Sequence, residues 1–367
     1  MAKEKKILIF SPFKNDNNLY PHCAVFFKEL ANFANIDFQF FSERGLVLER
    51  ISKIIKQEPL KKFSYQRLID VKNEYKYLLE KYKNTDYDIV IAIDSVPYII
   101  ASMIFKTSKI ILWSHDFRSY DESVSKNILY KLSNRYTRHY LLKNKSLIIQ
   151  DDAREEVLLK SINVKKDCVK TMYMPVSLKE VNAFKEYNPN DKPMLMQIGG
   201  ISDYRSYSDL LIKHYNENSE LYDLTIHGYI SDEIKILLQN ISNKPVVSDG
   251  FYNPLETHNI VINSNIGFIA YVPTDLNFQN IRFASGQLVE FLRTGKPLII
   301  MGKTNLNQFI EENKVGVSIN SIDELNVAIK QITSNYNEYS RNCIQMFEKY
   351  YNIEKYINEF KLNFIDN

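Results

Sequence analysis

Short apolar runs alternate with longer amphipathic or charged segments along the first half of the chain. Each run is rich in β-branched residues and has the length of a strand, whereas the segments between the runs have the length of helices. This alternation predicts a parallel sheet with helices on both faces. The predicted strands are Lys6–Phe10, Asp37–Phe41, Asp88–Ile93, Lys109–Trp113 and Ser146–Gln150, and the predicted helices are Pro21–Phe33, Leu48–Lys83, Val96–Phe105 and Ser123–Leu142.

A polar stretch with three prolines, Lys165–Pro193, interrupts this pattern, and a second alternating series follows it. We therefore predict an N-terminal domain (1–172), a linker (173–193), a C-terminal domain (194–337) and a helical segment (338–367) that packs back across the hinge. The fold class is α/β, with two doubly wound Rossmann-like domains facing a central cleft. The strands of the second series are Met194–Ile198, Asp223–His227, Pro245–Val247, Ile266–Tyr271, Pro297–Ile300 and Gly316–Ile319.

The composition is that of a globular protein, with 45% hydrophobic and 25% charged residues among 367. It excludes a disordered, collagen-like or disulfide-scaffold protein. The three cysteines lie far apart and have no metal-binding spacing, so we expect neither a structural zinc site nor disulfides. No apolar run is long enough for a membrane span or a signal peptide, which predicts a cytoplasmic location.

Charge and glycine are distributed unevenly between the two halves. Residues 1–172 carry 30 Lys and Arg against 21 Asp and Glu, a net charge of +9, and the remaining residues carry a net charge of −6. Nine of the ten glycines follow residue 190. Two halves that differ in charge and in backbone requirements are expected to bind different ligands.

A glycine-rich turn after a strand occurs only in the second half. The first strand is followed by no GxGxxG fingerprint, and no GxxxxGK[ST] loop is present, which argues against dinucleotide-binding and P-loop proteins. Gly199 and Gly200 end the strand at Met194–Ile198, and Arg205 follows at the start of a helix. These residues can hold a phosphate; the alternative is a plain turn with a solvated arginine.

A second phosphate-binding feature lies between Arg282 and Ile300. A helix begins at Ser285–Gly286, carries Glu290 and ends before Gly295, which precedes a buried strand. The start of this helix can take a diphosphate, and Glu290 can accept hydrogen bonds from two sugar hydroxyls. The alternative is a well-capped helix with an exposed glutamate.

The segment from Ser285 to Ile300, with Glu290 and the Gly-Lys-Pro at 295–297, resembles the signature of GT-B glycosyltransferases close to the large retaining family 4. The resemblance extends over most of 194–320, through Gly199-Gly200, Arg205, the His-Gly-Tyr at 227–229 and the Asp-Gly at 249–250. It implies a hexosyltransferase that is metal-independent and retaining, needs no cofactor and uses a nucleotide-sugar donor, with a UDP-sugar expected. The implied donor-binding residues are Gly199, Gly200, Arg205, Tyr229, Phe251, Arg282, Ser285, Gly286, Gln287 and Glu290.

The resemblance also implies a role for several of these donor-binding residues. Glu290 would hold the ribose hydroxyls, Arg205 the diphosphate, the backbone at 285–287 the phosphates, and Phe251 the base. The family carries an acid eight residues before the ribose-binding glutamate, and here this position is Arg282. Arg282 would then contact a phosphate instead, or the protein is a catalytically silent GT-B subunit that binds a partner. A GT-B-shaped sugar-nucleotide epimerase is the further alternative.

Polar residues at the ends of strands in the first half are the candidates for acceptor binding and acid/base chemistry. Asp94 follows one predicted strand, and His115 and Asp116 follow the next. The carboxyl ends of parallel strands meet at one edge of a sheet, so we predict catalytic roles for His115, Asp116 and Asp94. The alternatives are a helix cap by Asp116, a satisfied surface histidine, and a helix start at Asp94.

Two basic segments of the first half contain interleaved aromatic residues. Residues 49–83 contain ten Lys or Arg, and residues 126–145 contain six more. One interpretation is a surface that binds anionic membrane, where lipid-linked acceptors are found; the alternative is a solvated helix face. No nucleic-acid-binding module is present. The predicted function is transfer of a sugar to a glycan or lipid-linked oligosaccharide in bacterial-type polysaccharide or glycoconjugate synthesis, with the enzyme peripheral on the inner face of the membrane.

Overall fold

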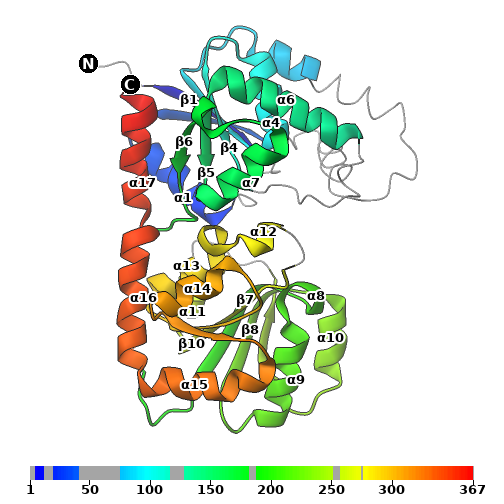
Figure 1. Cartoon of the computed structure of the whole chain (residues 1–367), viewed down its shortest axis with the longest axis vertical. Coiled ribbons are helices and arrows are strands. Elements are labelled where there is room, and N and C mark those ends of the chain that lie inside the picture. The colour runs from blue at the N-terminus through cyan, green and yellow to red at the C-terminus, as the bar shows by residue number, and fades with distance from the viewer. Residues whose placement is uncertain are drawn as a thin grey trace. The chain divides into compact units, whose positions relative to one another are not determined.

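The computed structural model describes residues 5–11, 20–40, 75–115, 128–181, 187–250, 257–273 and 276–366 (Figure 1). The chain divides into two compact units. The first unit comprises Met1–Met174 together with Lys355–Asn367, and the second comprises Pro175–Glu354. Each unit contains a six-stranded parallel sheet, so the predicted α/β class with two doubly wound sheets is confirmed.

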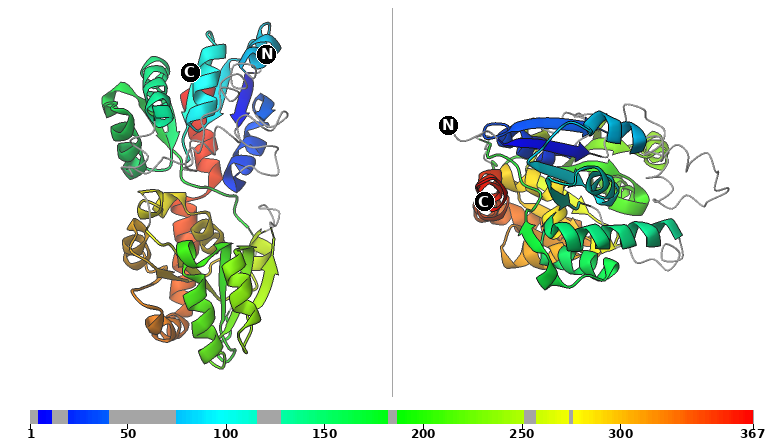
Figure 2. Two further views of the ribbon diagram at one scale, coloured as in Figure 1. Left: turned by 90° about the vertical axis from the view of Figure 1, so that its right-hand side faces the viewer. Right: turned by 90° about the horizontal axis from the view of Figure 1, so that it is seen from above.

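The first sheet has the strand order β2-β1-β3-β4-β5-β6. Its central strands are buried along almost their whole length, because helices cover both faces of the sheet (Figure 2). Its strands are β1 (Lys6–Ser11), β2 (Asn35–Phe40), β3 (Ile89–Ile93), β4 (Lys109–Trp113), β5 (Ser146–Ile149) and β6 (Lys170–Tyr173). Its helices include α1 (Pro21–Leu30), α4 (Ser95–Ile104), α6 (Ile128–Asn144), α7 (Asp152–Ile162) and α17 (Ile353–Phe360).

The strand β6 lies at the end of the predicted first domain, within the polar stretch that interrupts the alternation, and no strand was predicted there. β6 is an edge strand that pairs only with β5, and of its four residues only Met172 is buried. An edge strand with so few buried side chains has no apolar signature in the sequence. Most of the predicted helix at Leu48–Lys83 lies outside the described residues.

The second sheet has the strand order β12-β11-β10-β7-β8-β9, and it contains all six strands predicted from the sequence. They are β7 (Met194–Ile201), β8 (Asp223–Ile230), β9 (Val246–Asp249), β10 (Ile266–Ala270), β11 (Leu298–Met301) and β12 (Gly316–Ile319). The helices of this unit include α8 (Asp203–Ser206), α9 (Ser208–Asn218), α10 (Asp232–Gln239), α11 (Thr257–Val261), α12 (Leu276–Gln279), α13 (Gly286–Arg293), α14 (Asn305–Glu312), α15 (Leu325–Ser334) and α16 (Tyr336–Tyr350).

The strands β7 and β8 run further than predicted, and the expected turn at Gly199–Gly200 is instead strand. Gly199 pairs with Gly228, and both have positive φ angles, of 101° and 141°. A Cβ atom on Gly228 would lie 2.0 Å from the carbonyl oxygen of Gly199. The two backbones therefore approach each other too closely for any residue with a side chain at 228.

The C-terminal residues return to the first unit. Phe360 is fully buried there, and its ring lies 5.3 Å from that of Phe26 on α1. Lys109 at the start of β4 donates a hydrogen bond to the carbonyl oxygen of Asn363. The segment 355–367 is therefore part of the core of the N-terminal unit. None of the helices in the described ranges combines the length and the apolar character required to cross a membrane.

Candidate functional site

The first turn of α13 forms a capped helix start at the carboxyl edge of the second sheet. Ser285 is buried, and its hydroxyl accepts a hydrogen bond of 3.1 Å from the backbone N–H of Leu288. The hydroxyl of Tyr271, just after β10, lies 2.7 Å from the same oxygen. The N–H groups of Gly286 and Gln287 have no acceptor within α13, because the residues four positions before them lie outside this helix. They are available for an anion.

The side chain of Gln287 connects this helix start to β7. A Cβ atom placed on Gly199 would lie 2.6 Å from Nε2 of Gln287, so the amide lies directly against the backbone of the strand. An added Cβ atom on Gly200 or on Gly286 would meet no atom within 4 Å. The structure thus places the side chain of Gln287 against Gly199, and the predicted role of these residues in donor binding stays a prediction.

Glu290 lies one helical turn further along α13 and is 5% exposed. Its Oε2 atom accepts a hydrogen bond of 2.8 Å from Nε of Arg293, whose Nη2 is 2.6 Å away. Arg293 in turn donates to the carbonyl oxygen of Lys179. Burial raises the pKa of Glu290, and the neighbouring guanidinium opposes this increase. The alternative of an exposed glutamate is therefore excluded, and the carboxylate is held in a fixed orientation.

Arg205 and Tyr229 provide exposed groups near the same edge. Arg205 lies on α8, and its carbonyl oxygen accepts a hydrogen bond of 3.0 Å from the N–H of Val272, which fixes α8 beside the end of β10. Its guanidinium is 5.9 Å from the ring centroid of Phe278. Tyr229 is on β8 and is 59% exposed. Phe251, predicted to contact the base, lies outside the described residues.

Arg282 is held against an aromatic ring. Its guanidinium carbon lies 4.2 Å from the ring centroid of Phe283, and its buried Nε has no hydrogen-bond partner among the described residues. Its backbone N–H donates to Oδ1 of Asn305. This arrangement holds the backbone before Ser285, and the predicted phosphate contact of Arg282 stays a prediction.

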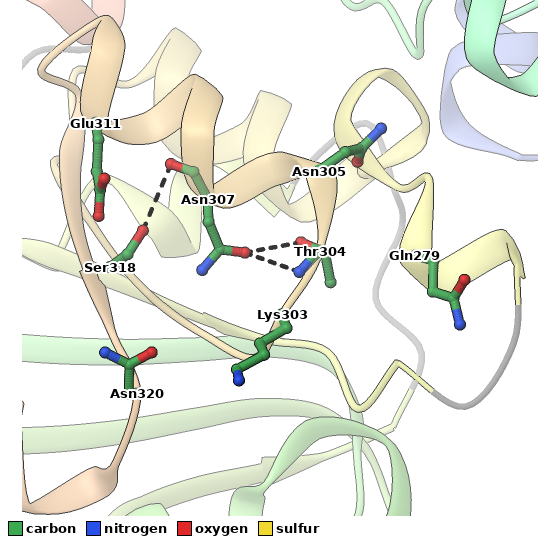
Figure 3. A pocket seen from close by; sticks show the side chains of 8 residues that line it. All are labelled: Gln279, Lys303, Thr304, Asn305, Asn307, Glu311, Ser318 and Asn320. Atoms are coloured by element: carbon green, nitrogen blue, oxygen red, sulfur yellow. Dashed lines mark hydrogen bonds between the residues drawn. The ribbon is translucent and has the colours of Figure 1, made fainter.

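A polar cavity of about 580 Å³ lies in the second unit at the carboxyl ends of β11 and β12 (Figure 3). Thr304 caps α14 there, and Asn307 closes the capping box. No sequence pattern marked this cavity, because its polar side chains come from α12, α14, β12 and the turns beside them and resemble ordinary solvated residues. Its lining residues are Gln279, Lys303, Thr304, Asn305, Asn307, Glu311, Ser318 and Asn320.

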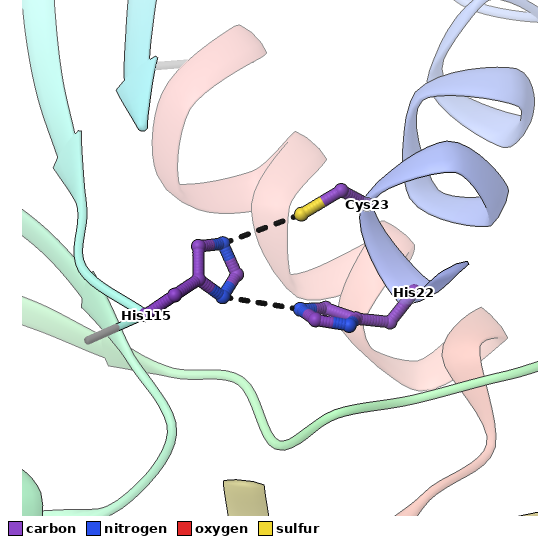
Figure 4. A group of neighbouring side chains, drawn as sticks. All are labelled: His22, Cys23 and His115. Carbon is purple, nitrogen blue, oxygen red and sulfur yellow. Dashed lines mark hydrogen bonds between the residues drawn. The ribbon is translucent and has the colours of Figure 1, made fainter. Parts of the chain in front are cut away.

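In the first unit, polar residues gather at the carboxyl ends of β3 and β4, as predicted. Asp94 follows β3 with a positive φ of 64°, and its Oδ1 atom accepts a hydrogen bond of 2.9 Å from the backbone N–H of His115. His115 is 5% exposed and faces α1, where its ring contacts His22 and Cys23 (Figure 4). The third predicted residue, Asp116, lies outside the described residues.

A hydrogen-bond chain from α7 reaches the ring of His115. Arg154 donates through Nε to Oε1 of Gln150, which turns the Nε2 amide group of Gln150 toward Nδ1 of His115 at 3.4 Å. Nε2 of His22 lies 3.1 Å from the same Nδ1 atom, and Nε2 of His115 is 3.3 Å from Sγ of Cys23, so the tautomer of His115 sets which of these groups donates. A second bond from Arg154 holds the carbonyl oxygen of His115.

Burial keeps both imidazoles neutral. It lowers the pKa of His22 to about 3, and burial, with the nearby His22 and Arg154, lowers the pKa of His115 well below its usual value. The alternative of a surface histidine does not apply, because His115 is enclosed. The catalytic roles of His115, Asp116 and Asp94 stay predictions.

Comparisons with known proteins agree with the architecture. Residues 283–359, which include α13 and Glu290, match the family described as Glucosyltransferase 3-like, C-terminal domain. Among solved structures, HepE of Anabaena in complex with UDP-glucose has a TM-score of 0.68 at 10% identity, covering 99% of this chain and 100% of its own. No curated protein matches the sequence.

Two other solved structures give the same result. A glycosyltransferase of Rickettsia africae has a TM-score of 0.67 at 12% identity, covering 100% of this chain and 99% of its own. The sucrose-phosphate synthase of Thermosynechococcus elongatus has a TM-score of 0.68 at 11% identity, covering 98% of each chain. These similarities show that the chain has the fold of GT-B glycosyltransferases, as the sequence predicted.

Proposed function

We propose that this protein is a glycosyltransferase that takes its sugar from a nucleotide donor bound at the start of α13. The observation that carries the proposal is the arrangement of three groups: the capped helix start at Ser285–Gly286, the glycine backbone of β7 against Gln287, and the buried carboxylate of Glu290. The match of residues 283–359 to a glucosyltransferase family and the UDP-glucose bound to HepE of Anabaena support it.

Backbone N–H groups and side chains share the binding of the nucleotide donor. The N–H groups of Gly286 and Gln287 and the guanidinium of Arg205 bind the diphosphate, and Glu290 accepts hydrogen bonds from the ribose hydroxyls. In the reaction the bond from the anomeric carbon to the diphosphate oxygen breaks, a bond from that carbon to the acceptor hydroxyl oxygen forms, and the hydroxyl proton passes to the leaving diphosphate. The diphosphate leaves with the pair of electrons, which the helix N-terminus and Arg205 stabilise without requiring a divalent cation at the phosphates.

Calorimetry with UDP, GDP and CMP tests the proposal. We expect one nucleotide to bind, with an affinity that falls at least about tenfold in Glu290→Ala and in Arg205→Ala. Arg341→Ala and Glu348→Ala, both on exposed positions of α16, are the matched controls and leave the affinity unchanged. Absence of binding to all three nucleotides contradicts the proposal.

The finer proposal is a retaining hexosyltransferase, supported by the resemblance of the segment 285–300 to retaining enzymes. The anomeric configuration of the product, read by NMR from a UDP-hexose donor, tests it, and an inverted product contradicts it. Turnover without added Mg²⁺ or Mn²⁺ tests the independence from a metal at the phosphates.

The acceptor is proposed to be a glycan on a lipid carrier, supported by the exposed face of α6. This helix contains no Asp or Glu, and it exposes Leu132 (42%) and Tyr136 (48%) between its cations. A basic face with apolar side chains suits an anionic bilayer surface. The exposed cations are Lys131, Arg135, Arg138 and Lys143.

Sedimentation with phosphatidylcholine vesicles, with and without phosphatidylglycerol, tests membrane binding. We expect binding only to the anionic vesicles and its loss in the double variant Arg135→Glu/Arg138→Glu. The double variant Lys330→Glu/Arg341→Glu changes the net charge equally on exposed positions of the second unit and is the control. Equal losses in both variants would show that net charge, not α6, governs the binding.

A silent GT-B subunit is the second candidate, and the position of Arg282 favours it. The family's first acid is replaced by a guanidinium that lies on Phe283. Nucleotide binding without release of sugar to any acceptor, together with a stable protein partner, would select this function over catalysis.

A further inference from the structure

The three side chains of His22, Cys23 and His115 meet in the interior of the first unit. One ligand atom from each lies within 4.8 Å of the others, and all three residues are buried. Figure 4 shows His22 and Cys23 reaching from the first turn of α1 toward His115 at the end of β4. Two imidazoles and a thiol form a ligand set that suits borderline transition metals rather than magnesium or calcium.

We infer that His22, Cys23 and His115 bind a single transition-metal ion of the zinc class. This site is separate from the proposed donor site, which belongs to the other unit. It is a structural link between α1 and the end of β4, and it gives His115 the role of a metal ligand in place of the catalytic role expected from the sequence. The inference therefore does not depend on the proposed function.

The distances are close to those of a metal site. In tetrahedral coordination, zinc at about 2.3 Å from sulfur and about 2.0 Å from nitrogen separates the two ligand atoms by about 3.5 Å. Sγ of Cys23 and Nε2 of His115 are 3.3 Å apart, so this pair needs to open by only a few tenths of an ångström. Nε2 of His22 lies 3.1 Å from Nδ1 of His115, the other nitrogen of that ring, so the His22 side chain has to turn toward the Cys23 side of the cluster to provide the third ligand.

Binding of the ion displaces the proton of the Cys23 thiol, because the thiolate is the form that ligates a metal. The ion would enter between Sγ of Cys23 and Nε2 of His115, which contact each other at 3.3 Å.

The surroundings fix the position of His115. Its backbone is held from two sides, by Oδ1 of Asp94 at the N–H and by Arg154 at the carbonyl oxygen. The ring therefore has a fixed starting point at the end of β4, with Nε2 facing Cys23.

The test uses the full chain after treatment with a chelator, titrated with Zn²⁺ alone and with Co²⁺ alone. We expect one equivalent of each to bind, and the Co²⁺ form to show a thiolate-to-metal absorption band in the near ultraviolet. In Cys23→Ser the band disappears, and the affinity for Zn²⁺ falls by roughly 100-fold or more. His22→Gln weakens binding as an independent second variant.

Cys343→Ser is the matched control, because Cys343 is also fully buried and its thiol pKa is also raised by burial, but it lies in the other unit. It keeps the band and the affinity. The inference is overturned if no equivalent of Zn²⁺ binds, if the Co²⁺ spectrum lacks the sulfur band, or if Cys343→Ser loses binding as Cys23→Ser does. UDP binding by the same samples reports separately on the proposed function.

Discussion

The carboxyl edges of the two sheets differ in the groups that form them, which are backbone groups in one sheet and side chains in the other. In the second unit the edge is made of backbone, with Gly199, Gly228 and the helix start at Gly286. In the first unit it is made of buried side chains, with His115 between Asp94 and Arg154. A backbone edge suits the close approach of a phosphate, whereas a side-chain edge fixes protonation and charge. Two six-stranded parallel sheets thus present different groups at their carboxyl edges.

This comparison is tested most strongly at Gly228. An alanine Cβ would overlap the carbonyl oxygen of Gly199, and the positive φ adds strain. We expect Gly228→Ala to lower the free energy of unfolding of the second unit by more than about 3 kcal/mol, measured by urea denaturation. Gly286→Ala, where the added Cβ meets nothing within 4 Å, should change it by less than about 1 kcal/mol. Equal effects would contradict the close approach of β7 and β8.

The side-chain edge is tested at Arg154. Removing this buried guanidinium leaves Oε1 of Gln150 and the carbonyl oxygen of His115 without their donor. We expect Arg154→Met to cost about 3 kcal/mol in urea denaturation of the first unit, with nucleotide affinity of the second unit unchanged. Arg138→Met, at an exposed position of α6, is the control. A loss of nucleotide affinity would show that the two edges depend on each other.

The buried carboxylate of Glu290 gives a pH dependence. Because its native pKa is raised above the usual value, the native state binds the proton more tightly than the unfolded state. The contribution of Glu290 to stability is therefore present at low pH and is lost as the pH rises through the raised pKa. Unfolding measured from pH 4 to 8 should show this decline, with a slope of at most about 1.4 kcal/mol per pH unit, and Glu290→Gln should lack it. A parallel pH profile for the variant would contradict the assignment.

The smallest expected effect is at the cap of α13. Ser285→Ala removes the acceptor of the Leu288 N–H and the partner of the Tyr271 hydroxyl. We expect a loss of about 1 kcal/mol in thermal or urea unfolding. Ser285→Thr should retain most of the stability, and a neutral Ser285→Ala would show that the helix start needs no cap.

The fold and the helix start at the carboxyl edge of the second sheet could be predicted, because the sequence patterns that mark them lie within single strands and helices. All six strands of the second sheet have short apolar runs, and Ser285, Gly286, Gln287 and Glu290 follow one another on a single helix. The edge strand β6 could not be predicted, since an edge strand buries too little apolar surface to mark it in the sequence.

The side-chain edge was only partly predictable. Asp94 and His115 were found because both directly follow apolar strands, but His22 and Cys23 precede His115 by more than ninety residues, and only the sheet brings them together. The burial of Glu290 and its bond to Arg293 also depend on packing. The spacing of residues in the sequence identifies functional groups that share one helix or strand. It does not identify their partners on another helix or strand.

The order in which the two units are synthesised has a consequence for folding in the cell. The first unit needs residues 355–367, whereas the second is the continuous stretch 175–354 of 180 residues. Ribosomes add about 5–20 residues per second, so synthesis of these 180 residues takes roughly 9–36 s. During this time α17, which contacts Phe26 through Phe360, has not yet been made. The second unit can therefore complete its core before the first unit does. The nascent first unit exposes apolar surface during this interval, and we expect chaperones to bind it there.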